Sequence, residues 1–154
     1  MSQVEDKLKE MGIELQAPAA AAGNYVSAVR TGNLVYLAGV GPRKPDGELV
    51  LGKVGRELTV EQGYEAARWC AVALLGNLRR EIGDLDNVVR FVKLLGMVNS
   101  DPEFTQPPAV MNGCSDLIVE LYGDRGRHAR SAVGMATLPN GMAVEVESIV
   151  EVRA

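Results

Sequence analysis

The C-terminal segment constrains the fold most, because two runs of strand-forming residues flank Asn140-Gly141. Asn-Gly tolerates positive φ at both central positions of a type I′ turn, the turn that joins adjacent antiparallel strands. The pattern therefore predicts a β-hairpin with Asn140-Gly141 as its two-residue loop. In this register Arg130 faces Glu151, and Ala136 faces Glu145.

The two faces of this predicted hairpin differ, because side chains alternate across a strand. The first face is apolar and needs a cover of helices; it carries Ser131, Val133, Met135, Thr137, Val144, Val146, Ser148, Val150 and Val152. The second face combines one arginine and several carboxylates with small residues: Arg130, Ala132, Gly134, Ala136, Glu145, Glu147, Ile149 and Glu151. It suits either a site for a small anionic ligand or a solvated sheet face with cross-strand charge pairs.

In the predicted hairpin, Arg130 and Glu145 lie about six ladder steps apart, or ~20 Å at roughly 3.3 Å per residue. Two side chains at that separation do not meet around one small ligand within a single chain. A site that uses both must therefore form across subunits.

The rest of the chain predicts a short N-terminal helix, two longer hydrophobic helices and three more strands. Thr59-Val60-Glu61-Gln62 is a capping box, and Pro107-Pro108 suits the first turn of a helix. The predicted elements are a short helix at 4–11, strands at 25–30 and 34–38, a helix at 59–82, a strand at 85–99, a helix at 109–122 and the C-terminal strands. This order predicts one α/β (α+β) domain over residues 1–154, with an N-terminal extension of about residues 1–23.

Two helices cover only one face of a single-layer mixed sheet. The face that carries Arg130, Gly134 and Glu145 is then bare in a monomer, and its small residues permit the close approach of another backbone. Cyclic assembly hides such a face, so we expect an oligomer with clefts between subunits.

Composition argues against several classes of partner. The net charge is −4, the pI is about 5.1 and aromatic residues make up 5% of the chain. Such a chain is not expected to bind nucleic acid, and no apolar run approaches the ~20 residues of a membrane span.

Cys70 and Cys114 lack metal-ligand spacing and are expected to be core thiols of a cytoplasmic protein. No metal site is expected, and His128, the single histidine, is expected in a loop at the rim of a cleft.

The Gly39-Val40-Gly41 stretch does not continue into a phosphate-binding motif. Glycine at position 39 is instead expected to let the backbone turn or approach a ligand closely.

Several short motifs, taken in order, resemble the Rid family, which is also called the YjgF family and often labelled endoribonuclease L-PSP. They are GNLVYLAG at 32–39, Gln62, Asn77-Leu78, Gly83, Asn112, ARSAV at 129–133, Leu138-Pro139 and VEVE at 144–147. The resemblance covers roughly residues 25–152. Ala132 stands where many members have cysteine, and the chain is longer at its N-terminus, which marks a divergent subgroup.

The resemblance implies a chorismate-mutase-like fold, a homotrimer and active clefts between subunits. It implies a hydrolase acting on C–N bonds, which deaminates reactive 2-enamines or 2-imines to 2-keto acids and ammonia without a cofactor. Arg130 matches the arginine that holds the substrate carboxylate, and Glu145 the acid that orients the attacking water. Tyr25 and Asn112 match residues lining the cleft, and Gly39 a backbone contact.

Two other functions stand beside imine deamination. The first is a non-catalytic trimeric binder or sensor of small carboxylic acids such as 2-keto acids. The second is RNA cleavage, suggested only by the family's label; the acidic pI and the single His128 argue against it, because metal-free RNA cleavage usually employs a general acid and a general base.

Overall fold

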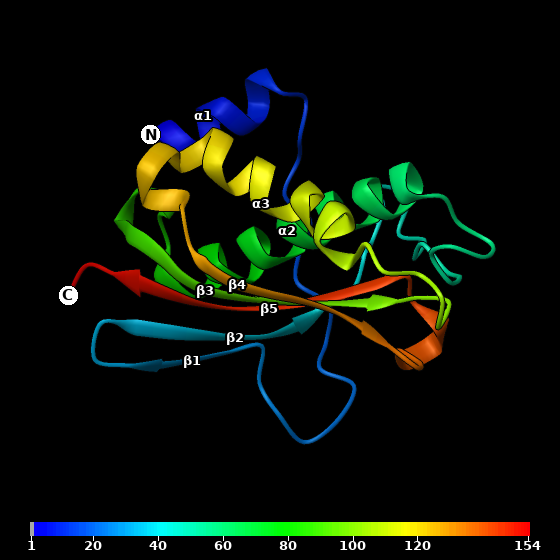
Figure 1. The fold of residues 1–154 in the computed structure, drawn as a ribbon. Helices are drawn as coiled ribbons and strands as arrows, with labels where there is room; N and C mark the ends of the chain where they lie inside the picture. Colours follow the sequence, from blue (N-terminus) through cyan, green and yellow to red (C-terminus); the bar gives the residue numbers. More distant parts are fainter. Residues whose placement is uncertain (1) are drawn as a thin grey trace.

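The computed structural model describes residues 2–154 as one five-stranded mixed sheet with helices on one face (Figure 1). The elements are α1 (Gln3–Glu10), β1 (Ala28–Thr31), β2 (Leu34–Val40), α2 (Val60–Ile82), β3 (Val88–Asn99), α3 (Pro107–Tyr122), β4 (Ala129–Met135) and β5 (Val144–Val152). The sheet order is β1-β2-β5-β3-β4; β4 is parallel to β3, and the other neighbours are antiparallel. The predicted single-layer sheet under two main helices is confirmed.

Local sequence signals account for the ends of the main helices. The Thr59 hydroxyl accepts from the backbone N–H of Gln62, and the Gln62 side chain accepts from the Thr59 N–H, so the predicted capping box is present. Helix α3 begins at Pro107, and both α2 and α3 are followed by a glycine with positive φ. The predicted β1–β2 hairpin also forms, with Gly32 at φ 58° in its turn.

The core lies between the sheet and helices α2 and α3. Leu74, Leu75, Leu117 and Ile118 are among its fully buried side chains, and they follow the helical spacing of the apolar residues. Cys70 and Cys114 are free thiols buried in this core, as predicted. Helix α1 packs on α3 at the outer side of the helical layer (Figure 1). Among residues 2–154, no helix combines the length and apolar character that crossing a membrane requires.

The predicted C-terminal hairpin is wrong in its pairing and correct in its turn. Asn140 and Gly141 have φ of 57° and 73°, the positive values expected of Asn-Gly, and the Met142 N–H donates to the Pro139 carbonyl across the turn that they form. Strands β4 and β5 do not pair, because β3 lies between them and pairs with both. A turn sets the local path of the chain, whereas burial of the apolar β3 between two neighbours sets the pairing.

This pairing reverses the face assigned to β4. Arg130 pairs with Leu94, and Leu94 is fully buried beneath the helices. Cross-strand neighbours share a face, so Arg130, and Ala132 two residues on, belong to the helix-covered side. Glu145 pairs with Met97 and alternates with the buried Val144 and Val146, so it belongs to the open side. The expectation that Arg130 and Glu145 share a face, with Arg130 opposite Glu151, is therefore wrong.

The open face of the sheet has no cover within residues 2–154 (Figure 1). Its members follow from the registers of the five strands: Val29, Tyr36, Lys93, Leu95, Met97, Ser131, Val133, Glu145, Glu147 and Ile149. Several are large apolar side chains left accessible; Val29 is 54% exposed, Tyr36 44% and Val133 43%. The predicted bare face is thus present, with Val133 rather than Arg130 as the contribution of β4.

Candidate active site

Arg130 is anchored to helix α3 through one end of its guanidinium. Its Nη1 donates to Oδ1 of Asn112 at 3.0 Å and to Oγ of Ser115 at 3.1 Å, and its Nη2 donates to the Pro108 carbonyl at 3.4 Å. Asn112 and Ser115 are three residues apart, so they lie on one face of α3. The helix therefore fixes the direction of the arginine side chain.

The edge of the guanidinium formed by Nε and Nη2, opposite Nη1, remains available for a ligand. Within residues 2–154, Nε of Arg130 donates no hydrogen bond, and Nη2 keeps one N–H beyond the one given to Pro108. The Nε and Nη2 donors form a planar fork that matches the two oxygens of a carboxylate. Arg130 also lines a surface depression with Asn112, Ser115 and His128, so the fork has access to a ligand.

Ser115 is hydrogen-bonded to the only histidine of the chain. Its Oγ lies 2.9 Å from Nε2 of His128, and Nδ1 of that imidazole lies 2.7 Å from the Gly126 carbonyl. Burial lowers the pKa of His128, an effect increased by the nearby Arg130 and opposed by the Gly126 hydrogen bond. His128 is half-buried in the depression beside Arg130, and the sequence pattern did not predict its pairing with Ser115.

The crossing of α2 and α3 positions this group. A Cβ atom at Gly113 would overlap the carbonyl oxygen of Tyr64, so the two helix backbones touch where α3 carries its polar face. The Tyr64 hydroxyl also donates to Asp116 at 2.7 Å. Close contact at Gly113 and this hydrogen bond fix the rotation of α3, and with it the positions of Asn112 and Ser115.

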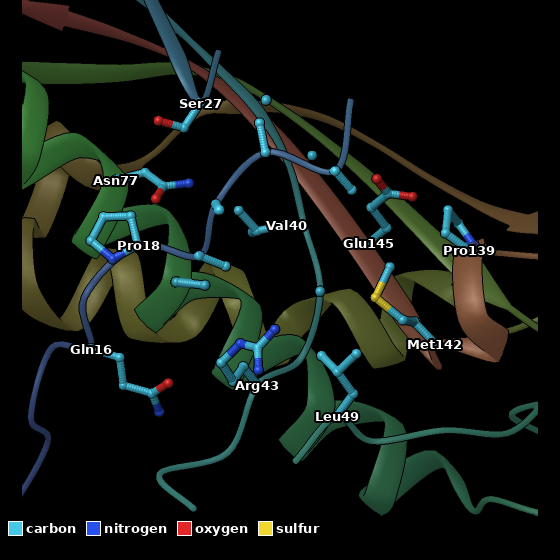
Figure 2. A pocket seen from close by; sticks show the side chains of 18 of the residues that line it. Gln16, Pro18, Ser27, Val40, Arg43, Leu49, Asn77, Pro139, Met142 and Glu145 are labelled. Carbon is cyan, nitrogen blue, oxygen red and sulfur yellow. The ribbon is translucent and has the colours of Figure 1, made fainter. Parts of the chain in front are cut away.

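Glu145 lies in a different cavity, of about 250 Å³, towards the β1–β2 edge of the sheet, where Ser27 just before β1 and Val40 at the end of β2 also line it (Figure 2). We call it the edge cavity. Tyr25 and Gly39 line the same cavity. The Glu145 carboxylate packs directly on Gly39, where a Cβ atom would overlap Oε1. Burial raises the pKa of Glu145, and the neighbouring Glu147 carboxylate raises it further. A carboxyl group with a raised pKa exchanges protons more readily near neutral pH.

The inner wall of this cavity comes from the N-terminal extension and α2. Residues 16–22 line it, and Asn77 of α2 faces it across from Glu145 (Figure 2). Asn77 is only 8% exposed, and its side chain makes no hydrogen bond within residues 2–154. Nε2 of Gln16 is also buried without a partner there. The extension therefore does contribute to the cavity that holds Glu145, and these two amides are polar wall residues that sequence patterns did not reveal.

The five predicted site residues thus divide into two groups. Asn112 and Arg130 share the depression at α3, whereas Tyr25, Gly39 and Glu145 share the edge cavity. The first group has a pair of guanidinium donors whose geometry suits a carboxylate, and the second has a carboxyl group with a raised pKa. Among residues 2–154, no cluster of three or more His, Cys, Asp or Glu side chains has the geometry for a metal ion.

Comparisons with known proteins agree with this fold. The family model described as "YjgF/chorismate_mutase-like, putative endoribonuclease" matches residues 5–151. Protein TCP17 of Trypanosoma cruzi is 47% identical over 150 residues, covering 97% of this chain and 94% of that protein. The 2-iminobutanoate/2-iminopropanoate deaminase of Mus musculus is 33% identical over 136 residues, covering 87% of this chain and 84% of that enzyme.

A solved structure is similar over almost the full length. The crystal structure of Atu1372 from Agrobacterium tumefaciens, a protein of unknown function, superposes with a TM-score of 0.91 at 42% identity. The match covers 98% of this chain and 93% of that one. Fold, sequence and family model agree, and the chain belongs to the YjgF/chorismate-mutase-like family, as its ordered motifs predicted.

Proposed function

We propose that this protein hydrolyses reactive 2-imines and 2-enamines to 2-keto acids and ammonia, in clefts between the subunits of a homotrimer. The observation that carries the proposal is the free Nε/Nη2 edge of Arg130, held open by Asn112 and Ser115. The similarity to the mouse 2-iminobutanoate/2-iminopropanoate deaminase, an enzyme named for imino acids, supports the same substrate class.

The carboxylate of the imino acid binds Arg130 in this proposal. A bidentate ion pair fixes both the position and the plane of the carboxylate, and with it the adjacent imine carbon. Asn112 supports the arginine and does not compete for the ligand, because its Oδ1 accepts from Nη1 on the opposite edge. An imine carbon is already electrophilic, so positioning and proton transfer account for most of the required catalysis.

Glu145 of a neighbouring subunit completes the site. Glu145 cannot reach a ligand on Arg130 within one chain, because the two side chains belong to opposite faces of the sheet. Packing of the open face against a second copy buries Tyr36 and Val133 and brings the edge cavity of one subunit to the α3 depression of the next. The Glu145 carboxylate then takes a proton from the attacking water, and Gly39 and Tyr25 line the same cleft.

Three further parts complete the proposal: the size of the substrate, the cofactor requirement and the location. Residues 16–22 of the N-terminal extension form the wall of the cleft behind Glu145, so they limit the size of the substrate side chain. No cofactor is required, because the proton transfers use Arg130-bound substrate, water and Glu145. We place the protein in the cytoplasm, where enzymes that use pyridoxal phosphate release such imines.

Ammonia release tests the proposal. An amino-acid oxidase or dehydratase generates the imine in situ, and ammonia formed faster than the spontaneous rate is measured with and without the protein. We expect acceleration by the natural chain and loss of the acceleration in Arg130→Ala. Equal acceleration by Arg130→Ala contradicts the assigned carboxylate site. Calorimetric binding of a 2-keto acid without any turnover identifies the protein as a non-catalytic binder instead.

A further inference from the structure

The edge cavity is lined by one arginine that has no anionic partner. Nη1 of Arg43 donates to the Gly47 carbonyl at 2.7 Å, and Arg43 forms no ion pair among residues 2–154. The carboxylates of Asp46 and Glu48, in the same loop, lie 3.7 Å and 3.2 Å from Nζ of Lys44 instead. The Nε and Nη2 donors of Arg43 are therefore available to a ligand in the cavity.

Asn77 adds an unpartnered amide to the same cavity. It is 8% exposed, and its side chain has no hydrogen-bond partner in the described part of the chain. Figure 2 shows Asn77 of α2 and Arg43, from the segment after β2, across the cavity from Glu145. Buried polar groups are normally paired, so a ligand that brings hydrogen-bond acceptors would satisfy both side chains.

The proposed binding mode directs the substrate side chain towards these groups. A carboxylate bound to Nε and Nη2 of Arg130 points the rest of the molecule away from that guanidinium. The side chain leaves the imine carbon on the side remote from Arg130, where the wall of the proposed cleft carries Glu145. Glu145 itself lines the edge cavity, so a side chain that passes its carboxylate enters the same space.

We propose that the edge cavity binds the side chain of the substrate, and that Arg43 and Asn77 hold a second carboxylate at the end of that side chain. The preferred substrates are then the 2-imino acids of dicarboxylic amino acids. This inference rests on the proposed imine hydrolysis. It makes Arg43 and Asn77 specificity-determining residues and leaves the chemical step to Glu145 and water.

The size and the lining of the edge cavity suit such a side chain. Its volume of about 250 Å³ is close to the lower limit of ~300 Å³ for small-molecule sites, so a methyl side chain would leave most of it empty. Alanines at positions 17, 19–22, 38 and 73 line the cavity and offer apolar contacts to the methylene groups. Of the lining residues, Arg43 alone is positively charged, and it would balance the charge of the second carboxylate.

The test compares kcat/KM for two imines of similar size, which amino-acid oxidases generate in situ from glutamate and from methionine. We expect the glutamate-derived imine to be preferred, and Arg43→Gln to lower its kcat/KM roughly 10- to 100-fold without changing that of the methionine-derived imine. Asn77→Ala should lower the same value roughly 2- to 10-fold.

Arg30→Gln is the matched control. Arg30 lies on β1 outside the edge cavity, and its Nε donates to the Gly32 carbonyl at 3.1 Å, so this variant also loses one charge and one hydrogen bond to a turn. Its kcat/KM should equal that of the natural chain for both imines. An equal rate for the two imines in the natural chain, or a preference that survives Arg43→Gln, overturns the side-chain site and leaves imine hydrolysis standing.

Calorimetry gives a readout that does not depend on turnover. 2-Ketoglutarate, a dicarboxylate, should bind at least ~10-fold more tightly than 2-ketobutyrate, a monocarboxylate, and Arg43→Gln should abolish the difference. This difference in a natural chain that releases no ammonia supports the dicarboxylate site and overturns the proposed hydrolysis. Equal affinity for the two keto acids in the natural chain overturns the dicarboxylate site, whatever the turnover.

Discussion

Arg130 and Glu145 occupy opposite faces of the sheet, on strands β4 and β5 that are separated by β3. Arg130 pairs with Leu94 of β3, and Leu94 pairs with Ser148 of β5. Ser148 is three residues from Glu145 along β5. The two backbones are thus ~10 Å apart along the strands and ~10 Å apart across them, with the sheet between the side chains. One chain therefore carries two incomplete groups, and this separation is the basis of the proposed intersubunit site.

Replacement of Arg130 by lysine tests the fork rather than the charge. Lysine keeps the positive charge but cannot make the planar bidentate contact. We therefore expect KM for the imine to rise roughly 30- to 150-fold, which corresponds to a loss of about 2–3 kcal/mol of binding free energy. Arg80→Lys, at an exposed position of α2, is the matched control and should leave kcat and KM unchanged. A natural KM in Arg130→Lys shows that charge alone holds the substrate.

Substitution of Gly39 by alanine tests whether the position of the Glu145 carboxylate depends on its close contact with the β2 backbone. A Cβ at position 39 overlaps Oε1 of Glu145, so the carboxylate must move. A displacement of this size is expected to lower kcat by roughly 10- to 100-fold with little change in stability. Glu145→Asp, which has a shorter side chain, should partly restore kcat when combined with Gly39→Ala. Lack of any effect in Gly39→Ala contradicts a catalytic position for Glu145.

The raised pKa of Glu145 makes a prediction about stability and pH. Because the pKa is higher in the folded chain than in the unfolded chain, the folded state is favoured below the unfolded value and loses that advantage as pH rises through the folded value. Glu145→Gln removes this loss, so its Tm should exceed that of the natural chain at neutral pH. The difference should shrink as pH falls towards the ordinary pKa of glutamate. A lower Tm for Glu145→Gln at neutral pH contradicts the raised pKa.

Gly113 provides a prediction about folding. Alanine at this position forces apart the backbones of α2 and α3 at Tyr64, and such overpacking costs about 1–3 kcal/mol of unfolding free energy. Denaturant unfolding of Gly113→Ala should show this loss. Gly23→Ala, where the added Cβ meets only ordinary contacts with the Tyr25 ring, is the control and should unfold as the natural chain. Equal stability of the two variants rules out a tight helix crossing.

The sequence predicted individual elements well because their signals are local. The capping box at Thr59, the prolines that open α3 and the positive φ of Asn140 each depend on residues within one turn of the chain. Strand pairing was less accessible, since Asn140-Gly141 says nothing about β3, some forty residues earlier, which enters between β4 and β5. The face of Arg130 was misassigned for this reason alone.

In the candidate site, too, residues in local motifs could be predicted, whereas contacts that depend on packing could not. Arg130, Glu145 and Asn112 could be selected from motifs, whereas the Ser115–His128 pair depends on the packing of α3 against β4. Two signals were present in the sequence: Ser115 follows Asn112 by three residues on one helix face, and the only histidine precedes Arg130 by two. Neither indicates a contact until the loop at 123–126 brings His128 onto the helix.

Complementation between two inactive variants tests the intersubunit site most directly. Arg130→Ala and Glu145→Gln are each expected to lack turnover, and hetero-oligomers are prepared by co-expression or by refolding an equal mixture. Random cyclic assembly pairs an intact Arg130 with an intact Glu145 in about one cleft in four, so ammonia release should return to roughly a quarter of the natural rate. Hetero-oligomers that form and remain inactive, or a natural chain that stays monomeric while turning over substrate, contradict the shared cleft.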